Sequence, residues 1–129
     1  MKKIALIFSF TMCMVVSALA QDRTVGLLMQ KSFPDLPGRE GVMLVVDFPP
    51  GDSSPKHRHN AHTFVYVLEG SIVMQVEGGE KVTLSPGGTF YETPDDIHVI
   101  SMNASDTKPA KALVFFVKKE GAPMTVPVP

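Results

Sequence analysis

The chain has 129 residues, of which 44% are hydrophobic, and it carries a formal net charge of −1. The absence of a basic surplus argues against nucleic acid or an anionic membrane as a partner. A chain of this length is enough for one compact domain and too short for two.

The first predicted element is a secretory signal peptide over residues 1–20. Lys2-Lys3 precede an apolar stretch from Ile4 to Val16, and Ala18-Leu-Ala20 has the small residues of a cleavage site. The apolar stretch is short for a membrane-spanning helix, which needs about 20 residues. We therefore expect cleavage after Ala20, a periplasmic or secreted protein, and no membrane attachment afterwards.

Residues 21–129 are predicted to form a single all-β domain. Cleavage removes two lysines and no acid, which changes the net charge from −1 to −3, and it removes Cys13, so the mature chain has no disulfide. Short apolar runs separated by turn residues at intervals of about 8–12 residues are typical of a sandwich or closed barrel. We expect strands at Val25–Met29, Val42–Phe48, Thr63–Leu68, Ser71–Glu77, Lys81–Leu84, Thr89–Tyr91, Ile97–Met102 and Ala110–Val117.

Three further expectations concern how these strands are arranged. Thr63–Leu68 and Ser71–Glu77 should form a tight hairpin over Glu69-Gly70. The proline-rich tail Gly121–Pro129 should run extended along the surface or an interface. Core and inter-sheet packing is expected of five aromatic residues: Phe64, Tyr66, Phe90, Phe115 and Phe116.

A group of histidines is the strongest functional signal in the chain. His57, His59 and His62 fall within six residues, and His98 lies in a later turn-rich stretch. On a strand, alternate side chains share a face, so His57 and His59 would project together and could hold one transition-metal ion. We predict a metal site formed by His57, His59 and His98. The alternative is an exposed histidine pair in a barrel without metal.

The spacing around these histidines resembles the first motif of the cupin superfamily, in its small single-domain form. The residues in register are Gly51, His57-Arg-His59, Thr63 and Gly70, and the segment from Gly88 to Asn103, with Pro94 and His98, resembles a degenerate second motif. The resemblance covers nearly all of the mature chain. It implies a small jelly-roll β-barrel, with a metal held in its mouth by two histidines, a carboxylate and the later histidine.

The chain departs from the cupin pattern at the carboxylate. Thr63 occupies the position of the usual metal-binding glutamate, and a hydroxyl is a weak metal ligand. A fourth ligand could be Thr63 itself, or His62 if the strand register shifts, because strict alternation points His62 to the opposite face. The second motif also has Asp96 in place of its glycine, and its spacing from Pro94 to His98 is one residue short.

Candidate acid–base groups accompany the predicted metal site. His62, Tyr91 and Glu92 are candidate catalytic residues, and Asp95 lies beside them in sequence. The simpler interpretation places Tyr91, Glu92 and Asp95 in solvated turns, and places His62 at the pocket rim or surface.

Three imidazoles leave coordination positions open on an ion such as Fe, Mn, Zn, Ni or Cu. We expect metal affinity to fall below about pH 6.5, because metal-bound histidines must be neutral. The favoured hypothesis is a metal-dependent enzyme, oxygenase-like, acting on a small organic molecule, and the resemblance also implies isomerase, lyase or decarboxylase chemistry. The alternatives are a non-catalytic barrel that binds metal or a small metabolite, and a dimerisation module. A homodimer formed through edge strands is a further expectation.

Overall fold

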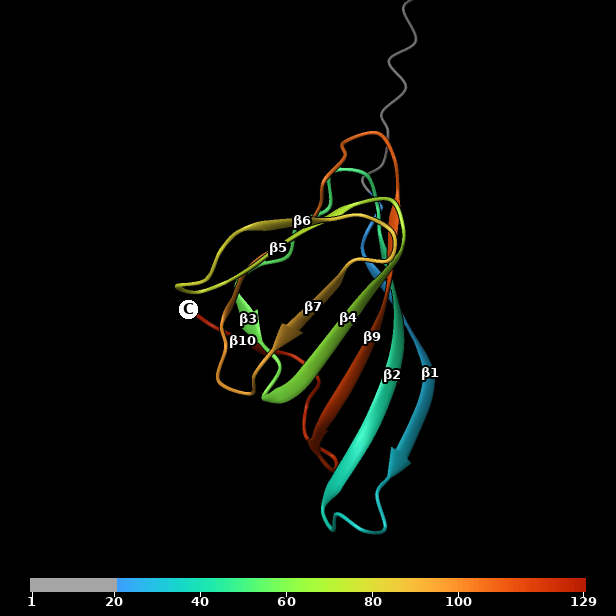
Figure 1. Cartoon of the computed structure of the whole chain (residues 1–129), viewed down its shortest axis with the longest axis vertical. Helices are drawn as coiled ribbons and strands as arrows, with labels where there is room; N and C mark the ends of the chain where they lie inside the picture. The colour runs from blue at the N-terminus through green and yellow to red at the C-terminus, as the bar shows by residue number, and fades with distance from the viewer. Residues whose placement is uncertain (1–20) are drawn as a thin grey trace, which may run out of the picture.

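The computed structural model describes residues 21–129, and the predicted signal peptide lies outside this range. The described residues form ten strands and no helix. Accordingly, this part of the chain contains no helix with the length and hydropathy needed to span a membrane. The strands form two antiparallel five-stranded sheets that enclose a common core (Figure 1). The predicted all-β jelly-roll class is confirmed.

Each sheet mixes strands that are distant in the sequence, as a jelly roll requires. The first sheet has the order β1 (Thr24–Ser32), β2 (Arg39–Phe48), β9 (Ala110–Lys119), β4 (Ala61–Glu69) and β7 (Thr89–Glu92). The second sheet has the order β10 (Val126–Pro127), β3 (His57–Arg58), β8 (His98–Asn103), β5 (Ile72–Val76) and β6 (Val82–Leu84).

Strand β4 shows which side chains reach the core. Its buried and exposed residues alternate, so Thr63 points inward while Phe64 and Tyr66 are 47% and 46% exposed on the outer face. The prediction that Phe64 and Tyr66 pack in the core is therefore wrong, because the period-two pattern places them on the opposite face from Thr63. Phe116 does lie in the core, and Phe90 packs against it.

The predicted tight hairpin between β4 and β5 is also wrong, since the two strands belong to different sheets. The chain crosses between the sheets at Gly70, which has a φ of +66°. A Cβ at this position would lie 2.5 Å from the carbonyl oxygen of Pro109. Only glycine combines this backbone conformation with so close an approach, and this is the physical reason for glycine at the end of the first motif.

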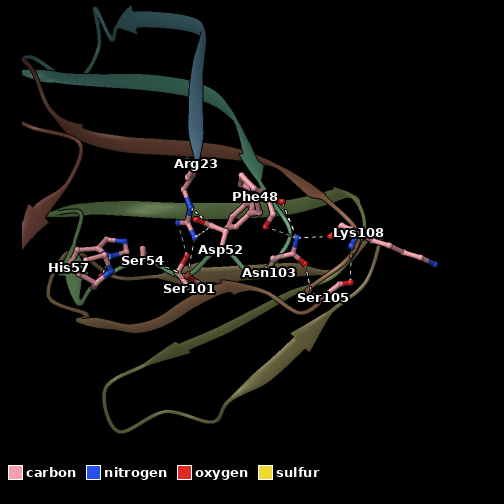
Figure 2. Close-up of polar contacts among 11 residues, drawn as sticks. Arg23, Phe48, Asp52, Ser54, His57, Ser101, Asn103, Ser105 and Lys108 are labelled. Carbon is pink, nitrogen blue, oxygen red and sulfur yellow. Dashed lines mark hydrogen bonds and ion pairs between the residues drawn. The ribbon is translucent and has the colours of Figure 1, made fainter. Parts of the chain in front are cut away.

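At one end of the barrel, the buried side-chain amide of Asn103 joins separate segments of the chain. The Nδ2 atom of Asn103 lies 2.9 Å, 3.0 Å and 2.8 Å from the carbonyl oxygens of Phe48, Pro49 and Lys108 (Figure 2). Its Oδ1 atom accepts a hydrogen bond from the backbone N–H of Ser105 at 2.8 Å. Asn103 thereby joins the end of β8 to the end of β2 and to the loop before β9.

The extended tail predicted after Gly121 is confirmed, and it completes the second sheet. Val126 and Pro127 pair with Arg58 and His57, which places β10 at the edge of the sheet beside β3. Figure 1 shows the C-terminus on the same side of the barrel as β3 and β10. Strands β3 and β10 were not predicted, because two residues are too few for a sequence pattern.

Candidate metal centre

Three histidines from two distant parts of the chain come together inside the barrel. His57 on β3 and His98 on β8 are direct partners in the strand register, and His59 follows β3 by one residue. The ring centroids are 4.9 Å apart for His57 and His59, 5.0 Å for His57 and His98, and 6.4 Å for His59 and His98. One ring nitrogen from each histidine lies within 4.8 Å of the others, which is close enough to hold a common metal ion.

Backbone carbonyls orient two of the three rings. His57 Nδ1 lies 2.8 Å from the carbonyl oxygen of Pro55, and His59 Nδ1 lies 2.7 Å from that of Met124 in the tail. Each Nδ1–H donates to its carbonyl, so the Nε2 lone pair of each ring is left for a ligand. Metal-binding histidines in proteins are usually held in this way.

The surroundings also favour the uncharged form of both rings. Burial lowers the pKa of His57 below the ordinary value of 6.5, and it does the same for His59. Hydrogen bonds to the Pro55 and Met124 carbonyls and the charge of Glu92 act in the opposite direction but are smaller causes. Near pH 7 the rings are therefore neutral, which is the state that binds metal.

Glu92 places a carboxylate in the same cluster. It is the last residue of β7 and is 2% exposed. Its Oε1 atom lies 3.0 Å from His98 Nδ1, and its Oε2 atom lies 3.9 Å from His59 Nε2. The interpretation of Glu92 as a solvated turn residue is wrong, because strand β7 extends one residue beyond the predicted Tyr91 and turns this side chain inward.

The cluster contains polar atoms whose hydrogen-bonding capacity is unused. Among residues 21–129, no hydrogen-bond partner is found for either carboxylate oxygen of Glu92 or for either ring nitrogen of His98, and all four atoms are buried. The contact between Glu92 Oε1 and His98 Nδ1 does not have the geometry of a hydrogen bond. Such groups are costly in a protein interior unless something binds them. Two free Nε2 atoms, a third imidazole and a carboxylate form a donor set that suits a divalent transition metal. The residues present thus fit the group that the resemblance implies.

The cluster opens onto a cavity of about 370 Å³. Its lining is largely apolar and comes from both sheets and from the tail, and it includes Leu44, Val46, Val65, Met74, Val114, Phe116 and Met124. Phe116 packs against the His59 ring with centroids 4.8 Å apart. A cavity of this size admits a small organic molecule, and its apolar wall would keep water from the histidines.

A second polar group borders the cavity at Arg23, just before β1. Its Nε atom donates to Asp52 at 2.7 Å, and its terminal nitrogens donate to the side chain and the carbonyl of Ser101 (Figure 2). The guanidinium also lies 4.3 Å from the ring centroid of Phe48. Asp52 balances the charge of Arg23, so we assign Arg23 a role in closing the barrel around the cavity.

The remaining predicted site residues divide between the two faces of the first sheet. Thr63 faces the cavity, and its hydroxyl lies 3.4 Å from the carbonyl oxygen of Ala61. His62 is exposed on the outer face, where its Nδ1 atom lies 2.7 Å from the hydroxyl of Tyr91. Tyr91 is 46% exposed, and Asp95 is exposed in the following turn. The structure thus places Thr63 in the cavity that the histidines also line, and it places His62, Tyr91 and Asp95 on the outside.

Sequence reasoning missed two contributors, Arg23 and Met124. Arg23 belongs to no motif, and Met124 contributes a backbone carbonyl, which any residue type can supply. The proline-rich character of the tail was the available signal, because it indicated an extended segment with free carbonyl oxygens.

A two-sheet jelly roll with histidines gathered in its interior defines a class of small barrels with a candidate metal centre. Residues 44–116 match the Cupin domain family, and this match covers more than half of the chain. The chain therefore belongs to the cupin family. No curated protein matches it.

Solved structures share the fold at low sequence identity. DMSP lyase DddQ from Ruegeria pomeroyi DSS-3 is 24% identical with a TM-score of 0.60, over 68% of this chain and 43% of that chain. Oxalate oxidase in complex with glycolate is 22% identical with a TM-score of 0.61, over 87% and 63%. A conserved protein with a double-stranded beta-helix domain from Klebsiella pneumoniae is 18% identical with a TM-score of 0.60, over 79% and 81%. The chain spans less than half the length of the DMSP lyases it matches.

Proposed function

We propose that this protein is an exported, metal-dependent enzyme of the oxygenase type that acts on a small organic molecule inside the barrel. The observation that carries the proposal is the cluster of His57, His59 and His98 at the edge of a 370 Å³ apolar cavity. A purely structural barrel has no need for a ligand-sized cavity beside three imidazoles. Two similar structures are enzymes, a DMSP lyase and an oxalate oxidase, which supports small-molecule chemistry on this fold.

In this proposal, some residues orient the metal-binding histidines and others bind the substrate. A bound divalent ion would supply a Lewis acid with open positions for water, substrate or dioxygen. The Pro55 and Met124 carbonyls keep His57 Nε2 and His59 Nε2 available to that ion. The aliphatic wall receives the apolar part of the substrate and excludes water. The polar end of the substrate is then directed to the histidine cluster, since Asp52 already satisfies Arg23.

The test is elemental analysis of the mature protein, purified without a metal-affinity column, followed by oxygen-uptake assays on small organic acids and alcohols. We expect one transition-metal ion per chain and substrate-dependent turnover that is lost in His59→Ala. Protein without stoichiometric metal after supplementation would refute the proposal. Stoichiometric metal without turnover on any substrate, together with tight binding of a small molecule, would instead establish a non-catalytic binding barrel.

Export of the protein and formation of a homodimer belong to the same proposal. We expect the mature protein from the cell to begin at Gln21, which N-terminal sequencing checks. Size-exclusion chromatography with light scattering checks for the homodimer. A mature protein that begins at Met1, or one that runs as a monomer, would overturn the respective part.

A further inference from the structure

Glu92 lies opposite Thr63 in the first sheet. In the register of β4 and β7, it is the direct cross-strand partner of Thr63. Thr63 and Glu92 are 1% and 2% exposed, and both side chains face the interior. Directly opposite residues in an antiparallel pair have Cβ atoms about 4.5–5.5 Å apart. Glu92 is thus one strand away from the position at which the resemblance expects a carboxylate.

The distances around Glu92 match those between ligands that share an ion. Two atoms bound about 2.1 Å from one metal ion are about 3.0 Å apart at right angles and about 4.2 Å apart across it. Glu92 Oε1 lies 3.0 Å from His98 Nδ1, and Oε2 lies 3.9 Å from His59 Nε2. Both separations fall within this interval, and neither oxygen of Glu92 has a hydrogen-bond partner in the described part of the chain.

Within the range that the structure describes, the buried carboxylate of Glu92 also lacks a cationic side chain as partner. Among residues 21–129, no lysine or arginine lies within ion-pair distance of its carboxylate, and its contacts at this range are the rings of His59 and His98. A buried carboxylate without a cationic side chain beside it is stabilised by a bound ion.

We propose that Glu92 is a metal ligand that replaces, from the neighbouring strand, the carboxylate that Thr63 lacks. The inference rests on the proposed metal site and adds its fourth protein ligand. The competing role for Glu92 is a positioning one, in which it accepts a hydrogen bond from His98 and touches no ion. The two roles make different demands: a ligand needs the charge in place, whereas an acceptor needs only an oxygen.

The experiment uses Co²⁺ as the probe and measures its affinity by competition with a chelator, together with its visible absorption spectrum. We expect Glu92→Gln to weaken Co²⁺ binding by more than about 100-fold, beyond the usual effect of an outer-shell change, and to alter the spectrum. The double variant Thr63→Glu, Glu92→Thr exchanges the two side chains across the strand pair. It should restore the affinity to within about tenfold of the wild type.

The controls separate the possible failures. Glu69→Gln removes an exposed acid elsewhere on β4 and should leave affinity and spectrum unchanged. Circular dichroism of the variants checks that they are folded. A wild type that binds no Co²⁺ would refute the metal site as a whole. A wild type that binds Co²⁺, together with a folded Glu92→Gln variant of similar spectrum and affinity, would refute the Glu92 assignment alone. A folded exchange variant that fails to recover the affinity would refute the inference that Glu92 replaces the carboxylate missing at Thr63.

Discussion

The tail residues 123–129 provide the sharpest prediction about the metal centre, because they contact it without supplying a side-chain ligand. The carbonyl of Met124 fixes His59 at 2.7 Å, and Met124, Thr125 and Pro127 line the cavity. Deleting residues 123–129 removes that acceptor and the pairing of β10 with β3. It retains Ala122, whose carbonyl accepts a hydrogen bond from Lys118 at 2.6 Å. The acceptor oxygen that Ala122 offers to Lys118 is therefore retained, now as part of the new C-terminal carboxylate, beside the buried Lys118–Glu40 ion pair.

The expected loss of metal affinity follows from the loss of the Met124 carbonyl that accepts from His59. Removing an outer-shell partner of a metal-bound histidine typically weakens metal affinity by about 10–100-fold, or about 1.4–2.7 kcal/mol. We expect the deletion to fall in this range in a chelator-competition titration with Zn²⁺. The fold should persist, because β10 contributes two residues at the edge of its sheet.

Two variants control the deletion. Met124→Ala keeps the backbone carbonyl, so its affinity should match the wild type within about threefold. Removing only Val128 and Pro129 deletes the contact from the Val128 N–H to Lys56 and keeps β10, and it should also have little effect. A folded 123–129 deletion with wild-type affinity would refute the reasoning that the Met124 carbonyl orients His59.

Three further predictions follow from other parts of the structure. Burial lowers the pKa of His57 and His59, so their rings stay neutral below pH 6.5. Metal affinity should therefore stay level down to that pH and fall only under more acidic conditions. Metal titrations at several pH values check this, and a decline that begins above pH 6.5 would contradict it. Asn103→Ala leaves buried carbonyls without donors and should lower the free energy of unfolding by about 3 kcal/mol in urea denaturation, whereas a loss under about 1 kcal/mol would show that water replaces the amide. Gly70→Ala forces a Cβ against the Pro109 carbonyl and should cost at least about 2 kcal/mol in the same assay; near-neutral stability would mean that the crossing between the sheets can relax.

The sequence predicted the barrel and the pair His57 and His59 because both depend on local spacing, and His98 was added as the only histidine of the second turn-rich stretch. Alternating apolar residues and turn residues mark most strands, and the interval from His57 to His59 is set by the chain itself. The inward position of Glu92 depends instead on the pairing of β7 with β4, which no local pattern specifies. The β4–β5 connection is a similar case, since Gly70 predicts a turn without indicating whether the chain stays in its sheet or crosses to the other.

The aromatic residues of β4 show a related limit. Phe64 and Tyr66 are apolar enough for a core, and their own strand has buried residues at the alternate positions. Which of the two faces turns inward follows from the position of His62, exposed on the outer face, and of Thr63, opposite Glu92 on the inner one. Strict alternation from Thr63, the position expected at the metal, already places Phe64 and Tyr66 on the outer face, so their expected core packing conflicts with that register.

The contact between His59 and Met124 joins residues that are 65 positions apart, and this separation determines when the metal centre can form. Contacts between such distant residues form only after the intervening chain has been organised, which makes folding slow compared with that of locally connected proteins. An ion that meets the unfolded chain finds at most the neighbouring histidines His57, His59 and His62, without His98. Metal binding should therefore select and stabilise an already assembled barrel rather than start its assembly. The protein would then load its ion as a finishing step of maturation, and the supply of metal would control how long the folded state persists.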